Sequence, residues 1–185
     1  MRKLFLAGAL ALFGAMSAQT FGLKAGMNVA SVTKGDGSRI SLNAGAFMNM
    51  PVATNFSIQP EVLYSGKGAK IKEEDMKATA ALDYISVPVM FQYNALPNLY
   101  LEAGPEFSFL LSAKAKGDGE SLDIKDSVNS FDFGIGLGAG YFFTPQIGLT
   151  ARYVAGMTEV DKDNSGGDKR KNNVFQVGLA YKFGK

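Results

Sequence analysis

Among the charged side chains in or beside segments otherwise rich in apolar residues, seven form a candidate cluster, and a charge in such a place needs a specific reason. They are four carboxylates and three cations: Glu61, Glu102, Glu106, Asp132, Lys24, Arg39 and Arg152. Two carboxylates held close together could serve as a general acid and a general base. In a confined space with cations nearby, ion pairing is the commoner outcome, because an unpaired buried charge is costly. We therefore expect a salt-bridged plug, with a narrow gated path as the alternative.

The composition removes most other chemistry. The 185 residues include no Cys and no His, which excludes disulfides, thiol nucleophiles, imidazole bases and nearly all zinc sites. Lys plus Arg number 19 and Asp plus Glu 17, and without Arg2 and Lys3 of the leader proposed below the balance is 17 against 17. A nucleic-acid binder normally carries a basic excess. We expect no catalytic activity, no cofactor and no nucleic-acid partner.

A run of alternate glycines over residues 134–140 superficially resembles a nucleotide-binding loop. A dinucleotide fingerprint needs a strand, a turn and then a helix, whereas here glycine recurs at every second position inside one strand-like segment. We interpret these glycines as keeping one wall of a barrel thin, which leaves room for Arg152 or Glu102 opposite.

A second motif, Asp161, Asp163 and Ser165, has the opening spacing of a calcium-binding loop. The closing bidentate Glu is missing, because Asn172 stands at the twelfth position, although Asp168 could substitute for it. The flanking segments also look like strands rather than the helices of an EF-hand. A solvated polar turn is the favoured interpretation, and the three residues are only a weak metal candidate.

The elements that would position these side chains are eight segments in which apolar and polar residues alternate with period two, the pattern of strands. Each is about long enough to cross a bilayer at a tilt. They cover residues 21–30, 39–48, 56–64, 85–93, 101–111, 132–143, 147–153 and 175–183.

The connections between these segments alternate between short and long. The short ones are 51–55, 96–98 and 144–146, and the long ones are 33–38, 66–79, 116–129 and 161–172. In an up-and-down antiparallel barrel, alternate connections lie at opposite ends. All long loops then share one end, and the short turns share the other with both chain termini. This asymmetry is typical of bacterial outer-membrane barrels.

The alternation itself does not distinguish a membrane barrel from a soluble sheet protein, since both give the same pattern. The composition of the two faces does. One parity carries bulky apolar residues in all eight segments, and the other carries Gly, Ser, Asn and a few charges, which fit the narrow interior of eight strands. Aromatic residues also fall into two belts, as expected at two membrane interfaces. The belts are Phe21, Phe56, Tyr93, Phe143 and Phe183 near the short turns, and Tyr64, Phe109, Phe131, Tyr153 and Phe175 near the long loops.

The first residues read as a secretory signal peptide. Arg2 and Lys3 precede an apolar run of 13 residues, and Ser17 and Ala18 supply small residues for cleavage after Ala18. A membrane anchor would need roughly 20 apolar residues. We predict a cleaved signal peptide over residues 1–18 and a single barrel domain over residues 19–185.

The chain resembles the PorT-type outer-membrane β-barrel proteins that are abundant in Bacteroidota. The segments that carry the resemblance lie at residues 21–28, 59–68, 84–93, 103–107 and 131–143. The resemblance implies an eight-stranded all-β transmembrane barrel in the outer membrane and implies nothing about activity. One departure is that Phe183 is followed by Gly184 and Lys185, so the aromatic residue usual at the last position is displaced.

Two hypotheses for function follow. The first is a small barrel with a packed polar lumen and a structural or interaction role through its extracellular loops. The second is a narrow pore or channel for small solutes. We expect a monomer whose partners are outer-membrane lipid or lipopolysaccharide and a protein at the extracellular loops. The basic run Lys169, Arg170 and Lys171 is favoured as a solvated surface, with contact to lipopolysaccharide as the alternative.

Overall fold

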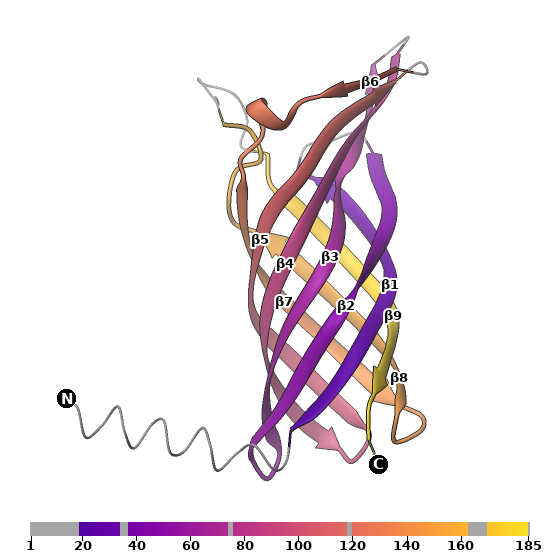
Figure 1. Ribbon diagram of the computed structural model, residues 1–185, viewed down its shortest axis with the longest axis vertical. Coiled ribbons are helices and arrows are strands. Elements are labelled where there is room, and N and C mark those ends of the chain that lie inside the picture. Colours follow the sequence, from indigo (N-terminus) through magenta and orange to yellow (C-terminus); the bar gives the residue numbers. More distant parts are fainter. Residues whose placement is uncertain (1–18, 34–36, 74–75, 118–119, 163–169, 185) are drawn as a thin grey trace, which may run out of the picture.

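The computed structural model describes residues 19–33, 37–73, 76–117, 120–162 and 170–184 (Figure 1). The predicted signal peptide and two members of the calcium motif, Asp163 and Ser165, lie outside these ranges. In the described ranges the structure is almost wholly β, and no helix there is long and apolar enough to cross a membrane.

Nine strands and one short 3-10 helix make up the described fold. They are β1 (Thr20–Val32), β2 (Gly37–Ala53), β3 (Phe56–Glu73), β4 (Met76–Leu96), β5 (Leu99–Gly117), β6 (Glu120–Asp123), η2 (Lys125–Ser127), β7 (Phe131–Phe142), β8 (Ile147–Gly156) and β9 (Asn172–Lys182). Eight strands pair in the order β4-β3-β2-β1-β9-β8-β7-β5, and β4 pairs with β5 to close the sheet. Every pairing is antiparallel. The predicted eight-stranded up-and-down barrel is confirmed.

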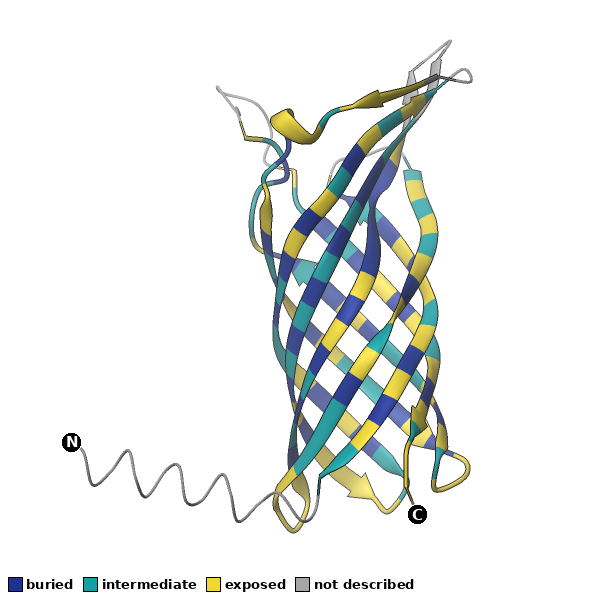
Figure 2. Cartoon of the chain, viewed as in Figure 1, coloured by how far each residue is buried: buried dark blue, intermediate teal, exposed yellow. Residues whose placement is uncertain are grey.

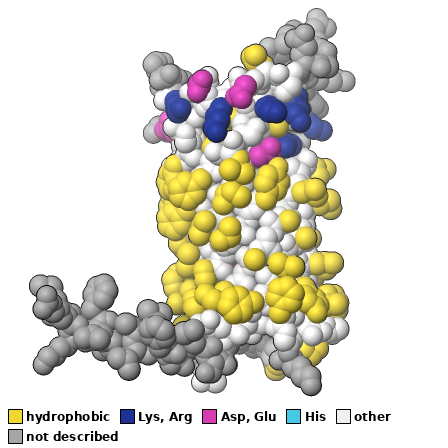
Figure 3. Space-filling view, viewed as in Figure 1, with side chains coloured by type: hydrophobic (Ala, Val, Ile, Leu, Met, Phe, Trp, Pro, Cys, Tyr) yellow, Lys and Arg dark blue, Asp and Glu magenta, His cyan; other side chains and the backbone are white. Residues whose placement is uncertain are grey.

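The apolar parity of each strand faces outward. Burial alternates from residue to residue along the strands (Figure 2), and large apolar side chains such as Leu137, Leu42 and Phe91 are more than half exposed. Hydrophobic side chains cover the barrel wall in the view of Figure 3, with the charged side chains gathered above them. A closed sheet with an apolar outside satisfies its backbone internally and presents hydrocarbon to lipid, as a membrane-spanning barrel must.

The two predicted aromatic belts lie on this outer surface. Phe56 and Tyr93 pair across β3 and β4 with ring centroids 5.1 Å apart. Phe109 and Phe131 pair across β5 and β7 at 5.6 Å. All ten belt residues are exposed on the outside of the barrel, and each belt contains at least one such cross-strand pair, as expected for side chains at the two membrane interfaces.

The long-loop end differs from the sequence prediction. Residues 66–79, expected as a loop, instead continue the β3–β4 hairpin up to the Glu73–Met76 pair. Part of the expected loop 116–129 forms β6, which pairs with β5 alone. The prediction was wrong here because hydrophobic alternation stops where the wall leaves the membrane, whereas backbone pairing does not need it. At this end β3, β4 and β5 consequently extend beyond the other strands of the barrel (Figure 1).

Three prolines lie at one level of three neighbouring strands. Pro60 pairs with Val89, which follows Pro88, and Pro88 pairs with Glu106, which follows Pro105. A proline has no N–H to donate to the ladder. The β2–β3, β3–β4 and β4–β5 ladders each skip two pairs beside one of these prolines and then resume in the same register. We call this level of the wall the proline row.

Candidate functional site

The centre of the lumen is occupied by Arg152, which reaches from β8 to carboxylates on two other strands. Its Nη1 and Nη2 donate to Glu61 Oε2 and Oε1 at 3.0 and 2.8 Å. Its Nε donates to Glu102 Oε1 at 2.8 Å. All three side chains are at least 96% buried, so this arginine crosses the interior and ties β8 to β3 and β5.

Lys24 from β1 completes a layer of balanced charge. Its Nζ donates to Glu61 Oε1 at 2.6 Å, and Gln59 donates to the same oxygen at 2.8 Å. Glu102 Oε2 accepts a hydrogen bond from Gln92 at 3.0 Å. Two cations thus face two carboxylates whose four oxygens are all bonded. We call Lys24, Glu61, Glu102 and Arg152 the lower layer.

A second group of charges lies nearer the long-loop end and centres on Lys67. Its Nζ is 3.1 Å from both Glu106 Oε1 and Asp132 Oδ2, and it donates to Ser108 at 2.9 Å. Thr158 donates to Asp132 Oδ1 at 2.7 Å. One cation here faces two carboxylates, and Glu106 Oε2 is buried without a hydrogen-bond partner among the described residues. We call Lys67, Glu106 and Asp132 the upper layer.

Arg39 does not join either layer. It lies close to the long-loop end, where its guanidinium bonds the Lys67 carbonyl and lies 3.3 Å from Asp83 Oδ1. Both side chains are partly exposed. The structure therefore brings six of the seven predicted charges into the two layers and leaves Arg39 at the rim.

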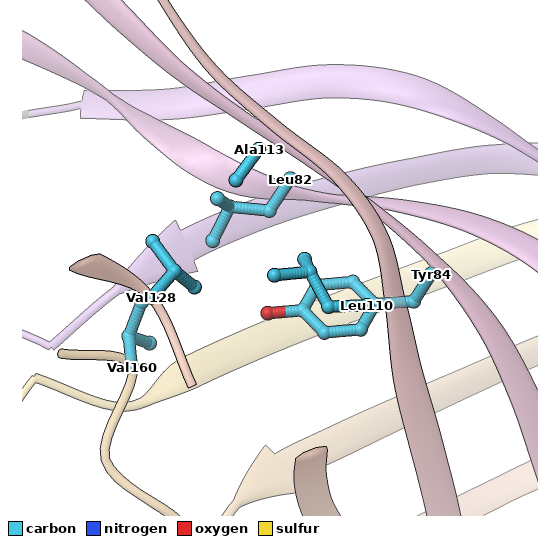
Figure 4. Packing of buried hydrophobic residues seen from close by; sticks show 6 residues of the cluster. All are labelled: Leu82, Tyr84, Leu110, Ala113, Val128 and Val160. Atoms are coloured by element: carbon cyan, nitrogen blue, oxygen red, sulfur yellow. The ribbon is translucent and has the colours of Figure 1, made fainter. Parts of the chain in front are cut away.

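Apolar clusters close the lumen above and below these layers. Toward the short turns, Phe47, Tyr100, Phe142 and Ala180 pack together. Toward the long loops, Val128 and Val160 from the connecting segments pack against Leu82, Tyr84 and Leu110 (Figure 4). The interior is thus filled along its length, as expected for the narrow bore of eight strands.

The glycines of β7 make space for large side chains. A Cβ at Gly140 would lie 2.3 Å from the Tyr100 ring, and a Cβ at Gly136 would lie 2.9 Å from Met90 Cε. At Gly138 the new atom would lie 2.5 Å from the Ala151 carbonyl oxygen and 3.1 Å from Arg152 Cβ, and at Gly136 it would lie 3.4 Å from Arg152 Cδ. The side chains nearest to these glycines are therefore Tyr100 and Met90, with Arg152 from the adjacent strand β8 also in contact range; Glu102 is not among the nearest atoms.

A small cavity remains beside the lower layer. Its volume is about 10 Å³, and it is lined by Lys24, Glu102, Arg152 and Gln176 among others. Gln176 Nε2 is buried with no hydrogen-bond partner in the described part of the chain. A volume of this size holds about one water molecule, so the space is far too small for a solute.

Only part of the predicted calcium motif lies within the described residues. Asp161 is described, and its Oδ2 lies 3.5 Å from Arg170 Nε, with both side chains exposed to a substantial degree. No group of three or more acidic side chains suited to a metal ion occurs in the described residues.

Residues 17–162 match the family described as outer membrane protein beta-barrel domain. The chain belongs to this family. No curated protein matches the chain. The family and the apolar outer wall of the barrel together place this protein in the outer membrane.

Solved structures with the same fold share little sequence with this member of the outer membrane protein beta-barrel domain family. Neisserial surface protein A is similar with a TM-score of 0.56 and 16% identity, over 89% of this chain and 97% of that one. Ail, the attachment invasion locus protein of Yersinia pestis, gives 0.53 and 16%, over 89% and 98%. A major outer membrane protein of Thermus thermophilus gives 0.50 and 14%, over 90% and 100%. At these identities the likeness shows the fold.

Sequence reasoning missed Lys67, the only cation of the upper layer among the described residues. Lys67 falls in the segment 66–79 that the sequence predicts as a loop, although it continues the inward parity of Gln59, Glu61 and Ser65. Extending that parity past the apolar segment would have found it. The same extension applied to β4 would have found Leu82 and Tyr84.

Proposed function

We propose that this family member is a closed, non-catalytic barrel whose role is exercised through its long-loop end. The observation that carries the proposal is Arg152, bonded to Glu61 and Glu102 across the lumen. Opposite charges neutralise each other within the layer, so no single-sign field exists there to select an ion. The carboxylates are also committed to cations inside the barrel, which leaves none of the lower-layer pair available to a substrate.

Planar-bilayer recording on purified, refolded protein tests this proposal. We expect no reproducible unitary conductance from the wild type. A steady unitary conductance whose size changes in Arg152→Ala would overturn it and establish the alternative, a narrow pore or small-solute channel. A pore would need open space in the lumen, and the cavity beside Gln176 lies there. Its volume of about 10 Å³ fits a single water molecule and is too small for a path through the barrel.

The partners we propose are lipopolysaccharide and a protein bound at the long-loop end. Among the basic run, Lys169 lies outside the described residues, Arg170 is exposed and Lys171 is half-buried. Cations on this surface suit the phosphates of an anionic glycolipid. Exchanging Arg170 and Lys171 for Gln should weaken retention of lipopolysaccharide during purification, and unchanged retention would remove this partner.

We further propose that the chain is a monomer of the PorT type from a member of the Bacteroidota, and that residues 1–18 are removed on export. The resemblance and the composition of the first residues support this. The intact mass of protein extracted from outer membranes tests the cleavage site. A mass that includes residues 1–18 would contradict it.

A further inference from the structure

The outer wall carries a hollow on its lipid-facing side, across β1 to β4. Its volume is about 330 Å³, and its outward lining is entirely apolar. The outward side chains are Phe21, Ala46, Met48, Pro60, Val62 and Val87. The Phe47–Glu61 pair of the β2–β3 ladder also belongs to the lining. Both Glu61 carboxylate oxygens are bonded inside the barrel, so no free charge faces the hollow.

The hollow arises from local sequence. Ala46 and Pro60 have short side chains where the neighbouring outward positions carry Phe21, Met48 and Val62. Phe21 and Val62 are each 55% exposed and so project into the surroundings. Pro60 also belongs to the proline row, and the β2–β3 ladder skips two pairs beside it. Ala46 and Pro60 therefore form the bottom of the hollow, and the longer side chains of the neighbouring outward positions form its rim.

The position of the hollow identifies what covers it. It is continuous with the apolar wall that faces the membrane, and Phe21 at its edge belongs to the belt near the short turns. Neither water nor a charged group is stable at such a surface. We propose that the hollow binds one acyl chain of a phospholipid from the leaflet on the short-turn side.

The gain comes from packing. Lipid tails are as apolar as the side chains they touch, so association inside a membrane depends on van der Waals contact. A chain on a convex part of the wall touches protein along one side, whereas a chain seated in the hollow touches its floor and its rim. The energy of each van der Waals contact is small, but a chain in the hollow makes more of them, so their sum favours binding there over binding elsewhere on the wall. A lipid seated there should exchange more slowly than lipids elsewhere on the wall.

The first experiment uses the wild-type chain in vesicles of phosphatidylethanolamine doped with a phospholipid that carries a diazirine in one acyl chain. After photolysis, adducts are mapped by mass spectrometry. We expect several-fold more adducts on residues 46–48 and 60–62 than on residues 135–139 of the outward face of β7. Equal labelling of the two regions would overturn the proposal.

The second experiment fills the hollow. Native mass spectrometry of detergent-solubilised protein should show one retained phospholipid for the wild type and several-fold less for Ala46→Phe. The matched control is Ala139→Phe, the same exchange on the outward face of β7, which should keep the lipid. Heat-modifiable gel migration shows that each variant is folded. Equal retention in Ala46→Phe, or a wild-type dimer in the native mass spectrum that Ala46→Phe abolishes, would overturn the proposal.

Discussion

The two charged layers of the lumen differ in how completely their buried carboxylates are neutralised by cations. In the lower layer, two cations meet two carboxylates and every carboxylate oxygen is bonded. In the upper layer, one lysine serves two carboxylates, and Glu106 Oε2 is without a partner among the described residues. Ser108 donates a hydrogen bond to Glu106, and Thr158 and Asn172 donate to Asp132, in place of a second cation.

The difference follows the depth of each layer. Ser108 and Asp132 of the upper region pair with each other and directly precede or follow the belt residues Phe109 and Phe131. The upper layer therefore reaches the level of the membrane interface. The lower layer lies between the belts, where the wall faces hydrocarbon and the cost of an unbalanced charge is greatest. The charges are therefore fully balanced in the lower layer, which is surrounded by hydrocarbon, and not in the upper layer, which lies at the interface.

The largest effect should come from Arg152→Ala. It leaves Glu61 and Glu102 buried with Lys24 as their only cation, and removing one partner from a buried ion-paired group typically costs about 3–5 kcal/mol. Urea unfolding in lipid vesicles, followed by gel migration, measures the change in the free energy of unfolding. A loss smaller than that of the upper-layer variant below would contradict the ranking of the two layers.

A cation on the other face of the same wall should be almost as harmful, for a different reason. Leu137→Arg places a charge on the lipid side, next to Gly138, which pairs with Arg152. We expect a loss of roughly 2–4 kcal/mol, the usual cost of an arginine near the membrane midplane. The same unfolding assay applies. Wild-type stability would mean that the inward and outward faces are inverted.

Lys67→Met should cost less than Arg152→Ala. It removes the shared cation of the upper layer but leaves the hydrogen bonds from Thr158 and Asn172 to Asp132. We expect a loss of about 1–3 kcal/mol, smaller than for Arg152→Ala because the upper layer reaches the level of the membrane interface, where an unbalanced charge costs less than it does between the belts. Lys70→Met is the matched control, because Lys70 is the next exposed residue on β3, and it should leave the unfolding midpoint unchanged.

The smallest effect, and the sharpest contrast, should come from Glu106→Gln. The exchange leaves one cation facing one carboxylate in the upper layer, and the change in unfolding free energy should stay within about 1 kcal/mol. The same exchange at Glu61 unbalances the lower layer and should be clearly destabilising. Equal losses at the two positions would show that charge balance does not distinguish the layers.

The sequence was sufficient for the fold because alternation, loop lengths and aromatic placement all depend on crossing a membrane. It also identified six of the charges in the two layers, since each breaks an apolar segment. It was insufficient at Lys67, where no apolar neighbours mark the strand, and at Tyr100, Met90 and Phe142. Apolar residues on the inward parity leave no compositional signal, because only closure of the barrel makes that side an interior.

The lower layer also constrains the order in which the barrel can form. Its partners are far apart in the chain: Lys24 and Glu61 by 37 residues, Glu102 and Arg152 by 50, and Glu61 and Arg152 by 91. Contacts of such separation form late, because the intervening loops must close first. Until β8 pairs with its neighbours, Lys24 is the one cation of the lower layer for Glu61 and Glu102, so we expect hairpins formed from the first five strands to keep these carboxylates hydrated. Loss of water from the lumen should then accompany closure of the barrel, and a chain truncated before Arg152 should keep a hydrated interior.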